Sequence, residues 1–421
     1  MERELEYLSE REAASECPAG NERRATPRDL PLSRERITID EKGVWHIHGY
    51  DEARQILRSE LVKQAGFMAE RVLHDEGSLL KNPPILYLEG DEHHRMRRET
   101  NRFFTATVTD RQYRDFMDAF SDELVERLKQ QRRAALDDLT MEMAVRVAAQ
   151  IVGLTDSLLP GLKGRLSGIL DMATQLSDDA PKILNLILSQ KALLLFLLLD
   201  VKPSIRVRRK QPRNDVISYL IGRGYSDIEI LTECVVYGVA GMATTREFIA
   251  VALWHLLERP HLRQRMLEGE QQERYAILHE ILRLEPVVGH LLRRTTQDIE
   301  IDSHGRTVTI PAGTLVDLNI YAANADPAMA GENALSVCPM RPLHSELGKV
   351  PEPVLSFGDG YHRCPGAFVA IQESDILLRK LLAIETLRIE REPDIRFSDV
   401  VKGYELRNFR IVVDEPAGRP A

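Results

Sequence analysis

A glycine-rich stretch near the C-terminus carries the residues whose chemistry is easiest to interpret. Residues 357–366 read FGDGYHRCPG and place Cys364 after a turn and before an apolar run typical of a helix. A sulfur at that position lies near the positive N-terminus of the helix, which favours the thiolate. Gly358, Gly360 and Gly366 permit positive φ angles and let the backbone pass close to a flat, bulky group. The stretch is suited to presenting one thiolate to a haem iron.

The same stretch matches the signature of a known family. The F-x-x-G-x-x-x-C-x-G spacing of the cytochrome P-450 family, the haem-thiolate monooxygenases, is met by Phe357, Gly360, Cys364 and Gly366. A buried free cysteine beside a glycine-rich loop is the structural alternative. The resemblance implies a heme b cofactor (iron protoporphyrin IX) with Cys364 as its only metal ligand. It also implies cofactor contacts from the rest of the loop: Phe357, Gly358, His362 and Gly366.

Two further stretches resemble the parts of that family that hold the haem propionates. Residues 91–98 read DEHHRMRR and predict a helix on which His93 and Arg97 share a face. A solvated basic helix is the alternative for this charge run. Arg293 aligns with the family's propionate arginine, whereas its neighbour Arg294 is open to a surface role. Arginine suits this task because its guanidinium binds a carboxylate in bidentate geometry.

A long helix is predicted from Asp227 to Arg259, because a capping box opens it at Ser226 and no proline interrupts it. At 1.5 Å per residue it spans about 50 Å, enough to cross a whole domain. Residues 240–245, AGMATT, lie at its middle, and close helix packing alone would explain the glycine at 241.

The AGMATT run resembles the family motif A-G-x-D/E-T-T, in which the glycine makes room for dioxygen and the threonine helps to deliver protons. The implied catalytic residues are Ala240, Gly241 and Thr244, while Ala243 replaces the acid of the motif. Glu247, one turn further on, is a candidate proton source, but it could equally be a partner of the adjacent arginine. Alternatively, a water chain or the substrate supplies the proton.

A third helix carries Glu280 and Arg283, three residues apart, which by itself indicates an ordinary ion pair. Before a matching cysteine loop, the pair resembles the family's E-x-x-R motif, whose third partner would be Arg341. The resemblance makes all three structural. Residues 322–327, AANADP, resemble the family's A-A-N-R-D-P but lack its arginine.

The composition limits the class of protein. A formal charge of −9 and a pI near 5.8 argue against a nucleic-acid binder. The four cysteines are widely spaced with no C-x-x-C pair, which favours neither a zinc site nor a disulfide framework and fits a reducing cytoplasm. The charged N-terminus predicts no signal peptide and no membrane anchor. The chain therefore resembles the soluble bacterial members of the family.

The predicted fold is mostly α with small β-sheets, the cytochrome P-450 fold in one large domain over residues 31–421. Residues 1–30 predict a loosely ordered arm. Residues 37–48 predict a hairpin, and residues 299–301, 306–310 and 314–318 predict a small sheet. The apolar run Ile183–Leu199 predicts a buried helix, a substrate roof or an oligomer contact, since its only unbroken part, residues 192–199, is too short to span a bilayer.

The implied reaction inserts one oxygen atom from dioxygen into a lipophilic small molecule, by hydroxylation or epoxidation. Without a flavin or nicotinamide motif in the chain, the electrons are expected from a separate ferredoxin or flavoprotein. Ala243 motivates an alternative, a peroxide-using or non-oxygenating haem-thiolate enzyme that performs coupling or rearrangement. A haem-binding module without turnover is the third possibility.

Overall fold

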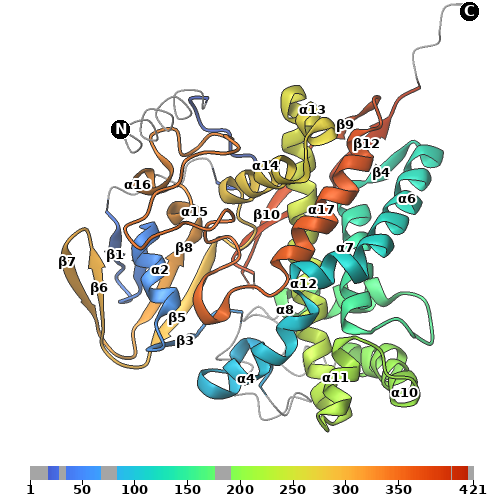
Figure 1. The fold of residues 1–421 in the computed structure, drawn as a ribbon, viewed down its shortest axis with the longest axis horizontal. Helices are drawn as coiled ribbons and strands as arrows, with labels where there is room; N and C mark the ends of the chain where they lie inside the picture. The colour runs from blue at the N-terminus through green and yellow to red at the C-terminus, as the bar shows by residue number, and fades with distance from the viewer. Residues whose placement is uncertain (1–17, 28–34, 68–82, 176–190, 400, 416–421) are drawn as a thin grey trace, which may run out of the picture.

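A computed structural model describes residues 18–27, 35–67, 83–175, 191–399 and 401–415. Over these residues the chain is mostly helical, and its short strands form four small sheets, which confirms the predicted fold class. Figure 1 shows the largest sheet and its hairpin on the left and most of the helices on the right.

The predicted hairpin is confirmed as β1 (Ile37–Ile39) and β2 (Trp45–Ile47), which pair antiparallel. They are the edge of a five-stranded sheet with the order β1-β2-β8-β5-β3. The other strands are β8 (Leu315–Asn319), β5 (His290–Thr295) and β3 (Val62–Gln64). The helix α2 (Tyr50–Arg58) follows the hairpin and buries Ala53, Ile56 and Leu57, the residues expected on its inner face.

The predicted sheet of three consecutive strands is wrong in its pairing. The strands β6 (Ile299–Ser303) and β7 (Arg306–Ile310) form a two-stranded sheet of their own. The third strand, β8, instead pairs parallel with β2 and antiparallel with β5. The alternating pattern identifies a strand, but it does not identify the partner when the partner is distant in sequence.

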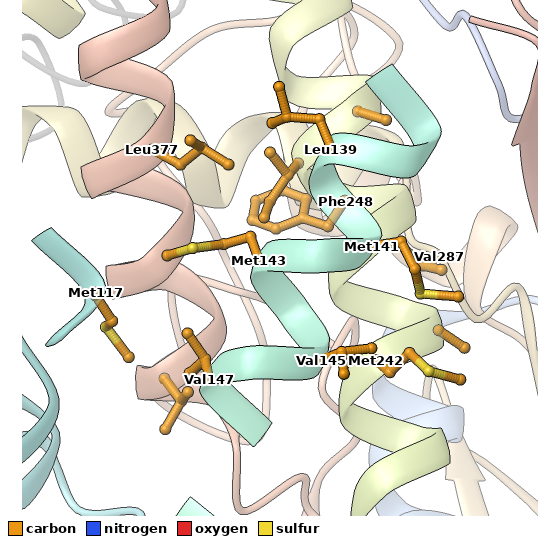
Figure 2. Packing of buried hydrophobic residues seen from close by; sticks show 14 of the residues in the cluster. Met117, Leu139, Met141, Met143, Val145, Val147, Met242, Phe248, Val287 and Leu377 are labelled. Atoms are coloured by element: carbon orange, nitrogen blue, oxygen red, sulfur yellow. The ribbon is translucent and has the colours of Figure 1, made fainter. Parts of the chain in front are cut away.

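The helix α12 (Asp227–Glu258) is the centre of the helical part, and its capping box between Ser226 and Glu229 is present. It packs against α7 (Leu136–Val152) and α17 (Ala367–Leu382). Figure 2 shows Met143 from α7, Phe248 from α12 and Leu377 from α17 meeting in one apolar cluster. The helices α6 (Arg114–Gln131) and α14 (Gln271–Leu284) pack on the other sides of α17.

The remaining elements connect these two parts or lie at the surface. The helices and helical turns are η1 (Ile85–Tyr87), α4 (Gly90–Thr100), η2 (Asn101–Phe103), α5 (Ala106–Val108), η3 (Thr109–Tyr113), α8 (Leu162–Gln175), η4 (Leu197–Val201), α10 (Lys202–Lys210), α11 (Val216–Gly222), α13 (Pro260–Glu268), α15 (Ile320–Ala323), α16 (Pro327–Ala330) and η5 (Gly360–His362). The strands are β4 (Arg133–Ala135), β9 (Leu387–Arg391) and β12 (Arg410–Val413) in one sheet and β10 (Asp394–Ser398) and β11 (Gly403–Arg407) in another.

Only α12, among the described helices, is long and apolar enough to cross a membrane, and 61% of its most apolar window is buried inside the protein. It is therefore the core helix of this fold rather than a span. Of the apolar run at 183–199, residues 183–190 lie outside the described residues, and residues 191–199 are helical.

The described part of the N-terminal arm, residues 18–27, packs against the body of the protein. Arg23 is buried and donates to the carbonyl oxygen of Tyr321 (2.9 Å), and the backbone N–H of Thr26 donates to Glu285 (2.7 Å). Residues 1–17 and 28–34 lie outside the described residues. The domain boundary at residue 30 therefore stays a prediction.

The cysteines differ from expectation in one respect. Cys234 and Cys364 are free, but Cys338 is disulfide-bonded. The prediction that the cysteines form no disulfide is thus wrong for Cys338, because wide spacing in sequence does not keep two cysteines apart in a fold. Cys17 lies outside the described residues. The cysteine content no longer argues for a reducing compartment.

Candidate active site

The cysteine loop is held against α2 by its own backbone and by one carboxylate. The backbone N–H of Cys364 donates to the carbonyl oxygen of Phe357 (2.8 Å). Asp359 accepts from Arg54 Nε (3.0 Å) and Arg58 Nε (2.9 Å) of α2. Gly360 has φ of 66°, and a Cβ there would lie 2.2 Å from the carbonyl oxygen of Leu57, so the close approach of the loop to α2 requires glycine.

Cys364 retains solvent-accessible surface, although it lies just before α17 in the middle of the fold. The protein atoms packed around the thiol raise its pKa, and this outweighs the opposite effects of the Gly366 N–H, Arg97 and Arg363. The expectation that this position by itself favours a thiolate is therefore wrong for the free side chain. A bound cation would supply the charge that stabilises the thiolate.

Two arginines converge near this loop, where Glu89 raises the pKa of Arg293 without forming a salt bridge with it. Arg293, on β5, is buried and donates through Nη1 to Gln64 Oε1 and to the carbonyl oxygen of Leu292, and burial lowers its pKa to about 10. Arg97, on α4, donates to the carbonyl oxygen of Arg363, one residue before Cys364, and burial lowers its pKa. Neither guanidinium is ion-paired to a carboxylate within the described part of the chain.

The two predicted histidines lie together beside these arginines. His93 and His362 stack with ring centroids 4.1 Å apart. His93 is only 2% exposed, its Nδ1 has no hydrogen-bond partner among the described residues, and burial lowers its pKa to about 4. His362 Nε2 lies 2.9 Å from Glu89 Oε2.

These observations test whether the site fits a haem. Buried cations without counter-ions and a buried nitrogen without a partner each cost free energy, so such groups are normally satisfied. The two propionates of a haem would provide two carboxylates for Arg97, Arg293 and the histidines. Cys364 lies next to the same groups and offers the sulfur ligand. The residues present therefore fit the cofactor.

The middle of α12 presents the predicted catalytic residues. Ala240 is exposed although it lies halfway along a core helix, and Gly241 and Thr244 are half-buried. Thr244 Oγ1 donates to the carbonyl oxygen of Ala240 (2.8 Å), so its hydroxyl oxygen is still able to accept a hydrogen bond. Ala243 is buried on another side of the helix.

Glu247 lies one turn further along α12 but is engaged elsewhere. Its carboxylate, 2% exposed, accepts from Arg246 Nε (2.7 Å), from Arg407 Nη1 (2.7 Å) and from the backbone N–H of Leu406 (2.8 Å). These contacts join α12 to β11. They favour a structural role, and the proton-relay role of Glu247 stays a prediction.

The three residues expected to be structural are brought together. Glu280 accepts from Arg283 Nε (2.7 Å) and from Arg341 Nε (3.1 Å) and also from the backbone N–H of Cys338 (3.0 Å). Sequence reasoning missed Asn324, whose side chain accepts from the backbone N–H of Leu355 (3.0 Å) and thereby ties this region to the cysteine loop. The AANADP stretch was its only signal in the sequence.

Known proteins resemble this chain over nearly its whole length. Residues 275–398 match the profile of the family described as Cytochrome P450. The "Biotin biosynthesis cytochrome P450" of Bacillus subtilis (strain 168) is 25% identical over 379 residues, 88% of this chain and 89% of that protein. Cytochrome P450 107B1 of Saccharopolyspora erythraea is 25% identical over 91% of this chain and 93% of its own length. The chain belongs to the cytochrome P450 superfamily.

Solved structures of other proteins have the same fold. The crystal structure of CalO2 superposes with a TM-score of 0.75 at 20% identity, covering 90% of this chain and 93% of that one. P450BioI, solved in complex with a fatty-acid-loaded acyl carrier protein, superposes with a TM-score of 0.70 at 22% identity, covering 97% of both chains. As a P450, this protein is a haem-dependent oxidoreductase of the monooxygenase class.

Proposed function

We propose that this P450 binds heme b through Cys364 and inserts one oxygen atom from dioxygen into a lipophilic small molecule by hydroxylation or epoxidation. The observation that carries the proposal is the set of unpaired cations at the cysteine loop. Arg97 and Arg293 are desolvated without an ion-paired carboxylate among the described residues, and His93 Nδ1 is buried without a partner. A haem with two propionates would satisfy these groups.

The residues around the haem have separate roles in this proposal. Cys364 ligates the iron, while Arg97, Arg293, His93 and His362 hold the propionates and so orient the cofactor. Phe357, Gly358 and Gly366 give the loop its shape around the sulfur. When bound, haem supplies the activation of dioxygen and the cleavage of its O–O bond. Glu280, Arg283 and Arg341 keep the loop behind the cofactor in place.

The residues in the middle of α12 have a different role in this proposal. Gly241 has no side chain and Ala240 only a methyl group, so both leave room for dioxygen or substrate. Thr244 moves a proton by donating from its hydroxyl and accepting a replacement from water, because its oxygen has a free acceptor site. Ala243 is not an acid and Glu247 is held by two arginines, so ordered water is the proposed source of the replacement proton.

The electrons are proposed to come from a separate acidic ferredoxin or flavoprotein that docks on the cysteine side. Arg95, Arg98 and Arg102 are exposed on and after α4, and Arg363 is exposed beside the ligand. Phe368, at the start of α17, is 53% exposed and adds an apolar contact to this surface. A basic surface with an exposed aromatic side chain suits an acidic partner. We also propose a cytoplasmic location; this rests on the resemblance to the soluble bacterial members of the family, because the disulfide at Cys338 removes the support from the cysteine content.

Substitution of Cys364 tests the ligand. Cys364→Ser should abolish the red-shifted absorption band of the reduced carbon monoxide complex. Cys234→Ser, at the other free cysteine among the described residues, should leave the band unchanged. Survival of the band in Cys364→Ser would overturn the assignment. A reaction under isotopically labelled dioxygen tests the monooxygenation. One labelled oxygen atom in the product for each electron pair consumed would establish it.

The second candidate function, a peroxide-using or non-oxygenating haem-thiolate reaction, is favoured by one observation. Position 243 is alanine where the family motif has an acid, so α12 lacks the usual carboxylate for proton delivery. Ala243→Asp discriminates between the two functions. In a monooxygenase it should raise the product formed per electron pair, whereas product formed without any electron donor would favour the second function.

A further inference from the structure

A continuous helical segment, residues 191–210, presents an outer face with two different ends. Leu194, Leu195 and Leu198 are 41–47% exposed near its start. Further along, Lys202 is half-exposed and Arg206 is exposed. The π-helical turn Leu197–Val201 lies between the apolar end and the basic end of the segment. The second half of the segment is α10, which Figure 1 shows beside α11 at the lower edge of the molecule.

A neighbouring turn adds two more leucines to the apolar end. Leu158 and Leu159 are 60% and 55% exposed, and the backbone N–H of Leu158 donates to the carbonyl oxygen of Leu199 (2.8 Å). The five leucines thus come from two adjacent segments. We call this set, Leu158, Leu159, Leu194, Leu195 and Leu198, the leucine patch.

Buried charges hold the turn in place. Asp200 is fully buried, accepts from Ser157 Oγ (2.6 Å) and from Arg165 Nε (2.6 Å), and so clamps the turn to the helix. Arg165 also donates to the carbonyl oxygens of Leu159 and Pro160, both at 2.9 Å. The exposure of these leucines is therefore built into the fold, since the backbone that displays them is pinned by charged hydrogen bonds.

Among the described residues of this region, several carboxylates are engaged by arginines, and further cations remain on the surface. Arg208 is 1% exposed and engages Asp156 and Asp215, just as Arg165 engages Asp200. The outward cations have no ion-paired acid within the described part of the chain: Lys191, Lys202, Arg206, Lys210 and Arg213. An apolar patch bordered by such cations stands out on a chain whose total charge is −9.

We propose that the leucine patch and its flanking cations bind the surface of an anionic lipid bilayer. Leucines at an interface insert into the acyl boundary while lysine and arginine contact anionic headgroups. A protein partner fits less well, because protein interfaces favour aromatic anchors and the large apolar side chains exposed here are all leucines. A second copy of the chain would bring like charges together.

The location of the patch gives the contact a purpose. The helix α8 starts directly after the leucine turn, and its Leu166 lies against α12, where a Cβ at Gly238 would be 3.2 Å from the leucine side chain. Gly238 is two residues before Ala240 and lies on nearly the opposite side of α12. The bilayer surface would therefore lie beside α8, which packs on the helix that carries the proposed catalytic groups, and a lipophilic substrate could approach that helix from the lipid. This purpose rests on the proposed function, but the binding itself does not.

Vesicle flotation of the haem-loaded protein tests the proposal. The protein should float with phosphatidylcholine vesicles that contain phosphatidylglycerol, and binding should fall with added salt. Leu194→Ser combined with Leu198→Ser should weaken binding about tenfold, and Arg206→Glu combined with Lys210→Glu by at least as much. The matched control is Leu267→Ser combined with Arg111→Glu, at exposed positions elsewhere, which should bind as the unchanged protein does.

Other outcomes overturn the proposal. Failure of the unchanged protein to float with the vesicles that contain phosphatidylglycerol rejects it directly. Loss of binding in the charge variant but not in the leucine variant would reject insertion of the leucines, because the contact would then be with the headgroups alone. A concentration-dependent dimer lost in the leucine variant points to a second copy. The carbon monoxide band of each variant verifies folding and haem ligation. A missing band in the unchanged protein, with flotation intact, would reject the proposed function while leaving the lipid contact standing.

Discussion

Replacing Arg293 by methionine is expected to change the stability of the haem-free protein and its affinity for haem in opposite directions. Arg293 is 4% exposed on β5, and its guanidinium is hydrogen-bonded to Gln64 and to a backbone carbonyl without an ion-paired carboxylate among the described residues. In the haem-free protein this buried charge lowers the free energy of unfolding. With haem bound, the same charge would face a propionate. Methionine fills similar space without the charge.

The magnitude follows from the pKa of Arg293. Burial lowers that pKa to about 10, which corresponds to roughly 3 kcal/mol against the charged form in the folded state. At pH 7 the side chain is charged whether the chain is folded or unfolded, so the full cost is present, and it is relieved only as the pH rises through 10. Arg293→Met should therefore raise the stability of the haem-free protein by about 3 kcal/mol, or about 3 °C in Tm. Loss of one partner of a buried ion pair should weaken haem binding by about 10² to 10³.

Thermal unfolding of the haem-free protein and the rate of haem transfer to a scavenging apoglobin measure the two effects. Arg294→Met is the matched control, because Arg294 is the next residue on β5, half-buried, and donates to the carbonyl oxygen of Gly313 (3.0 Å). The control should leave haem transfer unchanged. If Arg293→Met lowers the stability of the haem-free protein and leaves haem transfer unchanged, Arg293 is a structural residue and the reasoning is refuted.

Four further outcomes are expected. Thr244→Ala should lower the product formed per electron pair about tenfold. Glu247→Gln should leave that ratio unchanged and cost about 1–3 kcal/mol in urea unfolding, because it removes a charge held by two arginines. Burial raises the pKa of Glu233 to about 8, so between about pH 5 and pH 8 its carboxyl stays neutral in the folded protein but ionises in the unfolded chain, and the stability falls. Glu233→Gln should remove that fall and add about 3 kcal/mol to the free energy of unfolding at pH 7. A pH profile of stability that is unchanged in this variant would count against the reasoning. Arg98→Glu should slow reduction by an acidic donor about tenfold at low salt and have little effect at high salt, and equal rates at low salt would argue for another docking surface.

Local patterns in the sequence were enough to predict the elements that carry the site. The capping box at Ser226 predicted where α12 begins, because a cap acts only on the turn that follows it. The spacing of His93 and Arg97 predicted that they share a face of α4, and the glycine-rich turn predicted a bend before Cys364. Each of these signals depends on residues within about four positions of one another, a range over which backbone geometry alone decides the arrangement.

Partners from distant parts of the chain were decided only by the tertiary structure. Nothing near Glu247 in the sequence indicates that Arg407 of β11 would hold its carboxylate, and nothing near β8 indicates that it pairs with β2 rather than β7. The same is true of Arg293, whose role the resemblance to the family suggested but whose burial without a salt bridge to a described carboxylate appears only in the fold. The physical reason is that burial and ion pairing depend on which segments meet across the core, and these meetings are selected by the packing of the whole chain, not by the short-range spacing that shapes each element.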